Sequence, residues 1–218
     1  MTNTEWRFAT LVRTRRRRER ERSYFLKNCL KTYLTSLYST KSAVSMSELS
    51  MSLIRLCRGG DCDGVKEQLS NGADVNVQDD NDQTSLHMAS SYGHVDIVNL
   101  LLAAGASVDA QNYGNHTPLL LATGNGHFDI VKLLISAGAS VDTQGISGDT
   151  PLHRASLRGY SNVANLLLEA GASVNTQSSI GDTPLSLASS LGHTDVVKLL
   201  LDAGANIEIQ GNSRKNPL

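Results

Sequence analysis

The six histidines are the residues of this 218-residue chain best suited to acid–base or metal chemistry. An imidazole titrates near neutral pH and is a common metal ligand. No two of them have the HxxxH spacing that places a pair of imidazoles on one face of a helix. Five recur either three residues after a threonine or directly after a glycine, namely His87, His153, His94, His127 and His193. We interpret these five as structural, whereas His116 lies outside both settings and is a candidate contact residue.

Other signatures of catalysis or metal binding are missing from the sequence. It contains no GxSxG, GxxxxGK[ST] or HExxH motif. The run from Asp61 to Gly64 begins like a calcium loop but lacks the later ligands of that motif. Cys29, Cys57 and Cys62 form no CxxC pair, which argues against a zinc site or a disulfide framework and fits a reducing intracellular setting. The sequence therefore predicts no enzyme, no cofactor and no metal site.

The elements that would position such residues form a repeat. Near-identical segments open every 33 residues, at Thr84, Thr117, Thr150 and Thr183. Threonine is a favourable helix N-cap, and the proline after three of these threonines suits the first helical position. A glycine then ends this first helix, and a second helix follows with one apolar face. Each copy thus predicts a pair of short helices, joined to the next pair by an extended finger.

Helices this short are marginal alone, so the copies must stack on one another. The inward positions are taken by leucine and alanine in every copy: Leu86, Leu119, Leu152 and Leu185, and Ala89, Ala122, Ala155 and Ala188. Glutamine also recurs every 33 residues, at 78, 111, 144, 177 and 210. We favour a structural role in which the stacked amides bond to one another and align the fingers. The alternative is a polar line that a partner recognises.

The TPLH sequence at 150–153, with the Gly-His, Ile-Val and Gly-Ala pairs of the copies, resembles the ankyrin repeat. This resemblance covers residues 51–210. It implies a mostly α-helical solenoid whose fingers and first helices form a concave face, and protein binding without catalysis. It also implies that the TPLH imidazoles bond to nearby backbone. The departures from the pattern, which affect local turns and not the fold, include Ser85, Leu120, Ser186, Asp82 and Asn115.

The chain divides into parts of opposite charge. Residues 1–50 carry eleven Lys and Arg against four Asp and Glu, a net charge of +7, whereas residues 51–218 carry nine against seventeen, a net charge of −8. The predicted repeats are 51–78, 79–111, 112–144, 145–177 and 178–210, and the first of them is degenerate. Residues 211–218 begin a truncated sixth repeat. Because an ending at Leu218 leaves the last helix pair uncapped, a fragment of a longer ankyrin protein is one interpretation.

The basic N-terminal segment 1–50 is expected to be partly helical or disordered. Its run from Arg13 to Arg22 resembles a nuclear localisation signal, and the alternative is a solvated, disordered stretch. Residues 24–38 have the spacing of an amphipathic helix. That helix would cap the first repeat, act in a mitochondrial presequence, or contact a partner or membrane, and capping is the simplest use. We expect a cytoplasmic or nuclear protein with no membrane span.

Partner-binding residues are expected just before each threonine and seven or eight residues after it, at positions that the fold itself leaves free. Several are apolar, or of types enriched at binding hot spots. The alternative is that they pack on one another between repeats. The predicted protein-binding residues are Tyr92, Tyr113, His116, Asn125, Ile146, Asp149, Leu157, Arg158, Ile180, Asp182 and Leu191.

The function that fits these features is a monomeric scaffold or adaptor that binds protein partners of unknown identity. The alternative is a regulatory or targeting subunit of an enzyme complex. No small-molecule substrate is expected, because a solenoid of short repeats offers a shallow groove and no enclosed pocket. The acidic charge of the repeats disfavours nucleic acid as a ligand.

Overall fold

The structure, a computed structural model, describes residues 48–209. These residues form helices and loops, and no strand occurs among them. Residues 48–59 are helical and precede α2 (Cys62–Ser70). The later helices pair as α3 (Ser85–Tyr92) with α4 (Val95–Ala103), α5 (Pro118–Asn125) with α6 (Phe128–Ser136), α7 (Pro151–Arg158) with α8 (Ser161–Glu169), and α9 (Pro184–Ser190) with α10 (Thr194–Asp202).

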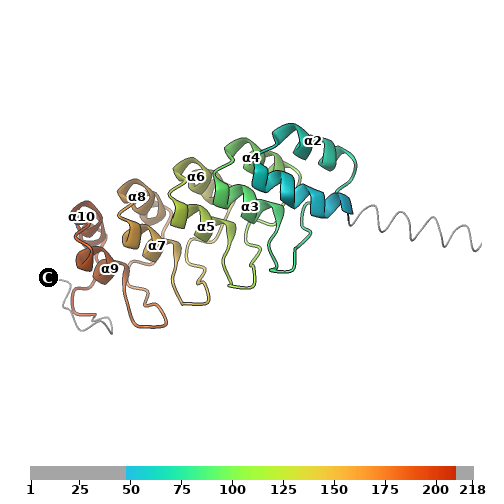
Figure 1. Cartoon of the computed structure of the whole chain (residues 1–218). Helices are drawn as coiled ribbons and strands as arrows, with labels where there is room; N and C mark the ends of the chain where they lie inside the picture. The colour runs from blue at the N-terminus through green and yellow to red at the C-terminus, as the bar shows by residue number, and fades with distance from the viewer. Residues whose placement is uncertain (1–47, 210–218) are drawn as a thin grey trace, which may run out of the picture. The chain divides into compact units, whose positions relative to one another are not determined.

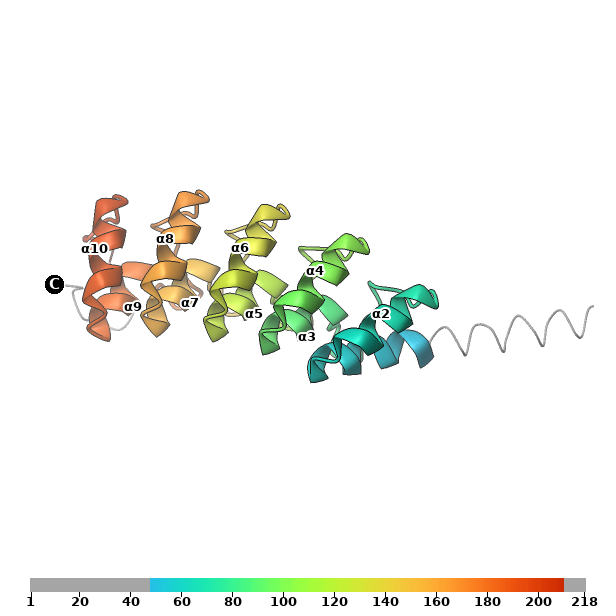
Figure 2. The same ribbon diagram turned by 90° about the horizontal axis from the view of Figure 1, so that it is seen from above.

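The helix pairs lie side by side, with α3, α5, α7 and α9 in one row and α4, α6, α8 and α10 in a second (Figures 1 and 2). Long loops, the fingers, project beside the first row (Figure 1). The predicted mostly α-helical solenoid is confirmed.

Several sequence predictions concern residues outside the described range. The basic run from Arg13 to Arg22, the amphipathic helix at 24–38 and the truncated repeat at 211–218 all lie there. The helical residues 48–59 extend across the predicted boundary at residue 50. Among residues 48–209, no helix has the length and apolar character needed to span a membrane.

The first helix of each later repeat begins where its threonine predicts. The Thr150 side chain accepts a hydrogen bond from the backbone N–H of His153, and the other three threonines cap α3, α5 and α9 in the same way. Gly93, Gly126 and Gly159 end α3, α5 and α7 in the left-handed conformation, at φ of 84°, 76° and 71°. The α9 helix ends earlier, at Ser190, with Leu191 still in the right-handed region.

The core runs continuously through the stack. Each leucine and alanine predicted to face inward is almost completely buried, and α3, α5, α7 and α9 contact one another in series. Cys57 belongs to this core, and burial raises the pKa of its thiol to about 12. It therefore behaves as a small neutral apolar residue, in keeping with a structural role.

The finger tips, residues 79–83, 112–116, 145–149 and 178–182, bond to one another through the backbone. The N–H of Tyr113 donates to the carbonyl oxygen of Asn81 at 3.0 Å, and Ile146 to that of Gly114 at 2.9 Å. Ser179 likewise donates to Ser147 at 3.0 Å. These bonds fix the register of neighbouring repeats.

Among the four residues of the glutamine ladder that the structure describes, Gln78, Gln144 and Gln177 join parts of the fingers, but no bond connects one side-chain amide to another. Gln144 Nε2 donates to the carbonyl oxygen of Gly148 in its own finger at 2.9 Å and to that of Gln177 in the next finger at 3.3 Å. Gln78 makes the equivalent bonds to Asp82 and Gln111, at 3.1 and 3.5 Å. The partners are backbone carbonyls, so the predicted amide-to-amide bonding is wrong.

A second ladder, unrecognised in the sequence, joins the other side of the repeats. Asp142 Oδ1 accepts from the backbone N–H of Ser173 in the next repeat at 2.9 Å. Side chains at intervals of 33 residues do the same, and they are Asn76, Asp109 and Asn175. The side-chain oxygens of these Asn and Asp residues therefore accept hydrogen bonds from the next repeat, at the start of the loop that follows its second helix.

Two departures from glycine in the fingers leave the turn geometry unchanged. Asp82 and Asn115 have φ of 57° and 55°, close to the 70° of Gly148 and the 83° of Gly181 at the equivalent positions. Asn and Asp tolerate this left-handed conformation better than most other residues. All four fingers consequently make the same turn.

Candidate functional site

The histidines of the TPLH position bridge neighbouring repeats. His153 Nδ1 lies 2.8 Å from Thr150 Oγ1, and its Nε2 lies 3.0 Å from the carbonyl oxygen of Asp182 in the next finger. His87 makes the corresponding contacts with Thr84 and His116 at 2.8 and 2.9 Å. Burial lowers the pKa of both imidazoles, so both are neutral at pH 7. The predicted structural role of these two residues is confirmed.

The histidines that follow a helix-ending glycine reach back to the preceding repeat. The Nε2 atoms of His94, His127 and His193 lie 3.2, 3.0 and 3.2 Å from the carbonyl oxygens of Arg58, Ser91 and Leu157, respectively. Each oxygen belongs to the end of the preceding first helix. These three histidines are therefore structural as well.

The start of a calcium loop at Asp61 is a helix cap. The Asp61 carboxylate accepts from the backbone N–H of Gly64 at 3.0 Å at the beginning of α2. Asp63 instead pairs with Lys66 at 3.2 Å. No group of three or more potential metal-ligating side chains lies together in the part of the chain from 48 to 209.

Large apolar side chains are exposed on the face made by the finger tips and the helices α3, α5, α7 and α9, which we call the finger face. Tyr113 is 79% exposed and Leu157, the least exposed of the set, 38%. The other members, also exposed, are Tyr92, Ile146, Ile180 and Leu191. These exposed fractions favour a free surface over the alternative interpretation, in which the side chains pack on one another between repeats.

The remaining predicted site residues have different environments. Arg158 and Asn125 are exposed, and Asn125 Nδ2 donates to the carbonyl oxygen of Ser91 at 3.0 Å. Asp149 and Asp182, expected to project from the finger tips, are only 9% and 8% exposed. Each is the last residue of its finger tip and directly precedes the threonine that caps α7 or α9, so it lies where the finger joins the helix, and Asp149 also pairs with Arg154 of α7.

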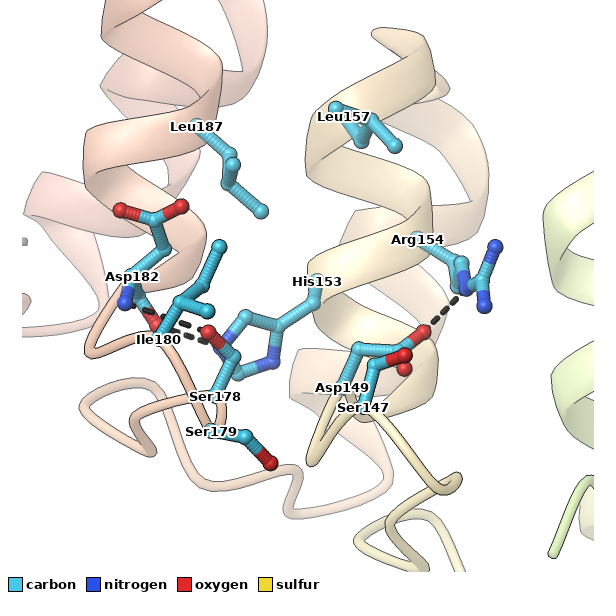
Figure 3. Close-up of a pocket in the computed structure, with 10 residues that line it drawn as sticks. All are labelled: Ser147, Asp149, His153, Arg154, Leu157, Ser178, Ser179, Ile180, Asp182 and Leu187. Atoms are coloured by element: carbon cyan, nitrogen blue, oxygen red, sulfur yellow. Dashed lines mark hydrogen bonds and ion pairs between the residues drawn. The ribbon is translucent and has the colours of Figure 1, made fainter. Parts of the chain in front are cut away.

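A pocket of about 480 Å³ lies between repeats four and five. Leu157 on α7 and Leu187 on α9 stand on its two sides, and Ile180 lies below Leu187 on the finger (Figure 3). Asp149 and Asp182 contribute its polar lining. The structure thus brings together four of the predicted site residues, Asp149, Leu157, Ile180 and Asp182, and leaves Tyr92 and Tyr113 outside the pocket.

Arg154 is a lining residue that the repeat pattern did not reveal. Its Nε atom donates to Asp149 Oδ2 (Figure 3). Burial, and then the charge of Arg154, lower the pKa of His116 on the preceding finger. A signal was present in the sequence, because the equivalent residues in the other three copies are all apolar: Met88, Leu121 and Leu187.

Comparison with known proteins agrees with the geometry. A family model described as ankyrin repeats (3 copies) matches residues 53–145 and 137–211. A segment of 49 residues, 22% of this chain, is 43% identical to serine/threonine-protein kinase 12 of Arabidopsis thaliana. The match spans only 11% of that kinase's length. It is therefore a similarity between segments and carries no activity over to this chain.

Proposed function

Because this chain belongs to the ankyrin-repeat family, we propose that it is a scaffold or adaptor that binds a protein partner through the finger face. Ankyrin repeats are protein-interaction modules, and stacked repeats create extended binding surfaces. On this proposal the chain is not an enzyme and acts through the partner that it holds.

The observation that carries the proposal is the exposed apolar set on the finger face. Tyr113, Ile146 and Ile180 lie on successive finger tips, and Tyr92, Leu157 and Leu191 lie at the ends of α3, α7 and α9. Burial of apolar surface contributes about 25 cal/mol per Å², so a partner that covers these side chains gains affinity. Tyrosine and arginine are also enriched at binding hot spots, and Arg158 lies on the same face.

The test is crosslinking pull-down with the full chain, followed by mass spectrometry to identify the partner. A variant with Tyr113→Ser and Ile146→Ser should lose most of the captured partner, with an unchanged circular dichroism spectrum. Leu201→Ser is the matched control, because Leu201 is 37% exposed on the second-row helix α10, away from the finger face. Equal loss in both variants would reject the finger face as the binding surface.

A regulatory or targeting subunit of an enzyme complex is the second candidate. A segment similar to 49 residues of this chain occurs within a protein named as a serine/threonine-protein kinase, which is why this candidate is tested beside the first. Under this function the captured partner is itself a catalytic subunit. The same mass spectrometry separates the two functions, because it identifies whether the captured partner is a catalytic subunit.

The remaining properties follow from charge and composition. Residues 51–218 have a net charge of −8, so the partner is a protein and not a nucleic acid. We expect a monomer, which light scattering after gel filtration tests directly.

For localisation we propose the cytoplasm or nucleus, with Arg13 to Arg22 as the signal. If a fluorescent fusion that lacks those residues is found in the same compartment as the full chain, they are not the localisation signal.

A further inference from the structure

Positive charge on the finger face is confined to one helix. Among residues 79–209, the first-row helices and finger tips contain Lys or Arg at two positions, Arg154 and Arg158. Both lie on α7, four residues apart, so both side chains lie on the same side of that helix. Leu157 precedes Arg158 and lines the pocket between repeats four and five. Arg154 is itself a lining residue of that pocket, and Arg158 is the neighbour in sequence of the lining residue Leu157.

The two arginines differ in how their charge is balanced. Arg154 donates through Nε to Asp149, which holds the guanidinium beside the finger. Arg158 is exposed and makes no hydrogen bond or ion pair with any residue of the described range. Each guanidinium has five N–H donors, so Arg158 keeps all of its donors for a ligand and Arg154 keeps its terminal ones.

The neighbouring pocket requires an apolar group. Leu157, Leu187 and Ile180 line it from α7, α9 and the last described finger (Figure 3). Asp182, on its polar side, is almost completely buried, and Asp149 is already paired with Arg154. A cationic group brought to this site would meet Arg158 with no exposed carboxylate to offset the repulsion.

We propose that the site between repeats four and five binds a segment of another protein that carries an aspartate or glutamate within about three residues of a large apolar side chain. The distance to be covered is about the width of α7, because a helix with its side chains is about 10 Å across. An extended peptide rises about 3.3 Å per residue, so about three residues cover that distance. The carboxylate accepts a two-pronged pair of hydrogen bonds from Arg158, and the apolar side chain enters the pocket. This inference rests on the proposed protein-binding function and specifies the partner's chemistry.

A carboxylate fits this site better than a phosphate. Phosphate-binding domains typically use clusters of arginine to balance about two negative charges. Here one arginine is unpaired and the other is partly neutralised by Asp149. The net acidic repeats would also repel a dianion more strongly than a single carboxylate.

The experiment selects random peptides, displayed on phage, against the full chain. Enriched peptides are then synthesised with a fluorescent label, and their dissociation constants are measured by anisotropy. We expect an acidic residue close to Leu, Ile, Phe or Met in the enriched set. Arg158→Ala should weaken binding about thirtyfold or more, the size of a binding hot spot. Lys198→Ala is the matched control, since Lys198 is an exposed cation on α10.

Charge reversal provides the second arm. Arg158→Glu should shift preference towards a peptide in which lysine replaces the acidic residue, a result that partial unfolding cannot produce. Phosphoserine in place of the acidic residue should bind no more tightly than the carboxylate. A tighter phosphopeptide, or enriched peptides that bind Arg158→Ala unchanged, would overturn the inference.

The outcomes also separate this inference from the broader proposal. If Arg158→Ala has no effect but Tyr113→Ser with Ile146→Ser weakens peptide binding, only the site between repeats four and five is rejected. If neither variant changes binding, or no peptide is enriched, both the inference and the finger-face function are rejected.

Discussion

The Nε2 atom of His153 lies 3.0 Å from the backbone carbonyl oxygen of Asp182, so one imidazole at the start of α7 is bonded to the finger of the next repeat. Its Nδ1 atom accepts from the backbone N–H of Thr150 at 3.2 Å. A single ring thus completes the cap of its own helix and joins two repeats. Leu120 and Ser186 occupy this position in the third and fifth repeats.

We predict that His153→Leu lowers the free energy of unfolding by about 1–3 kcal/mol, because it leaves the Asp182 carbonyl without its donor. Urea unfolding measures the loss, and hydrogen exchange should show weaker protection of the finger at 178–182. His193→Leu is the control, since its contact with Leu157 is exposed and longer, at 3.2 Å. Equal losses in the two variants would contradict the bridging role of His153.

The repeat pattern predicted those features that every copy shares. The threonine caps, the buried leucines and the helix-ending glycines follow from local preferences that recur every 33 residues. The pairing of Arg154 with Asp149 does not, because it occurs in one copy and depends on how a side chain folds back on its own finger. The burial of Asp149 and Asp182 was missed because only two of the four copies carry aspartate before the threonine, so the repeat pattern says nothing of that side chain.

The stability of the repeats should depend on pH through His87 and His153. Burial is the largest cause that lowers the pKa of each below its ordinary value of 6.5. The unfolded chain then binds protons more tightly than the folded one, so the free energy of unfolding is highest above about pH 6.5 and falls as the pH drops below it. Urea unfolding at about pH 7.5 and 5.5 measures this difference.

The double variant His87→Leu with His153→Leu provides the comparison. It should be less stable at the higher pH but lose less stability between the two pH values. A pH dependence as steep as that of the unmodified protein would mean that other groups cause it.

The left-handed turn of the fingers makes glycine important at one position and dispensable at another. A Cβ atom at Gly148, which has φ of 70°, would lie 2.5 Å from the backbone nitrogen of Ser179 in the next finger. Gly148→Ala should therefore cost about 1–3 kcal/mol. Asn115→Gly, at the equivalent position with φ of 55°, should stabilise by at most about 1 kcal/mol. Thermal unfolding measures both variants. The prediction would be contradicted if both substitutions raised the melting temperature or both lowered it.

Contacts between neighbouring repeats should dominate stability. Ala155 is completely buried between first helices, so Ala155→Asp introduces an unpaired charge and should cost several kcal/mol, on the order of 3–5. Ala103→Asp, at an exposed position of α4, should cost less than about 1 kcal/mol. Hydrogen exchange should show the loss beginning in the repeats on either side of residue 155. Unchanged protection there would contradict a stacked solenoid.

The central claim is that exposed side chains of the finger face bind a partner and contribute little to the fold. The most direct measurement combines Leu157→Ser with Arg158→Ala, and records both the melting temperature and the affinity for the captured partner. We predict that binding weakens by about 1–4 kcal/mol while the melting temperature stays nearly constant. A lower melting temperature with unchanged binding by the protein that remains folded would contradict the claim.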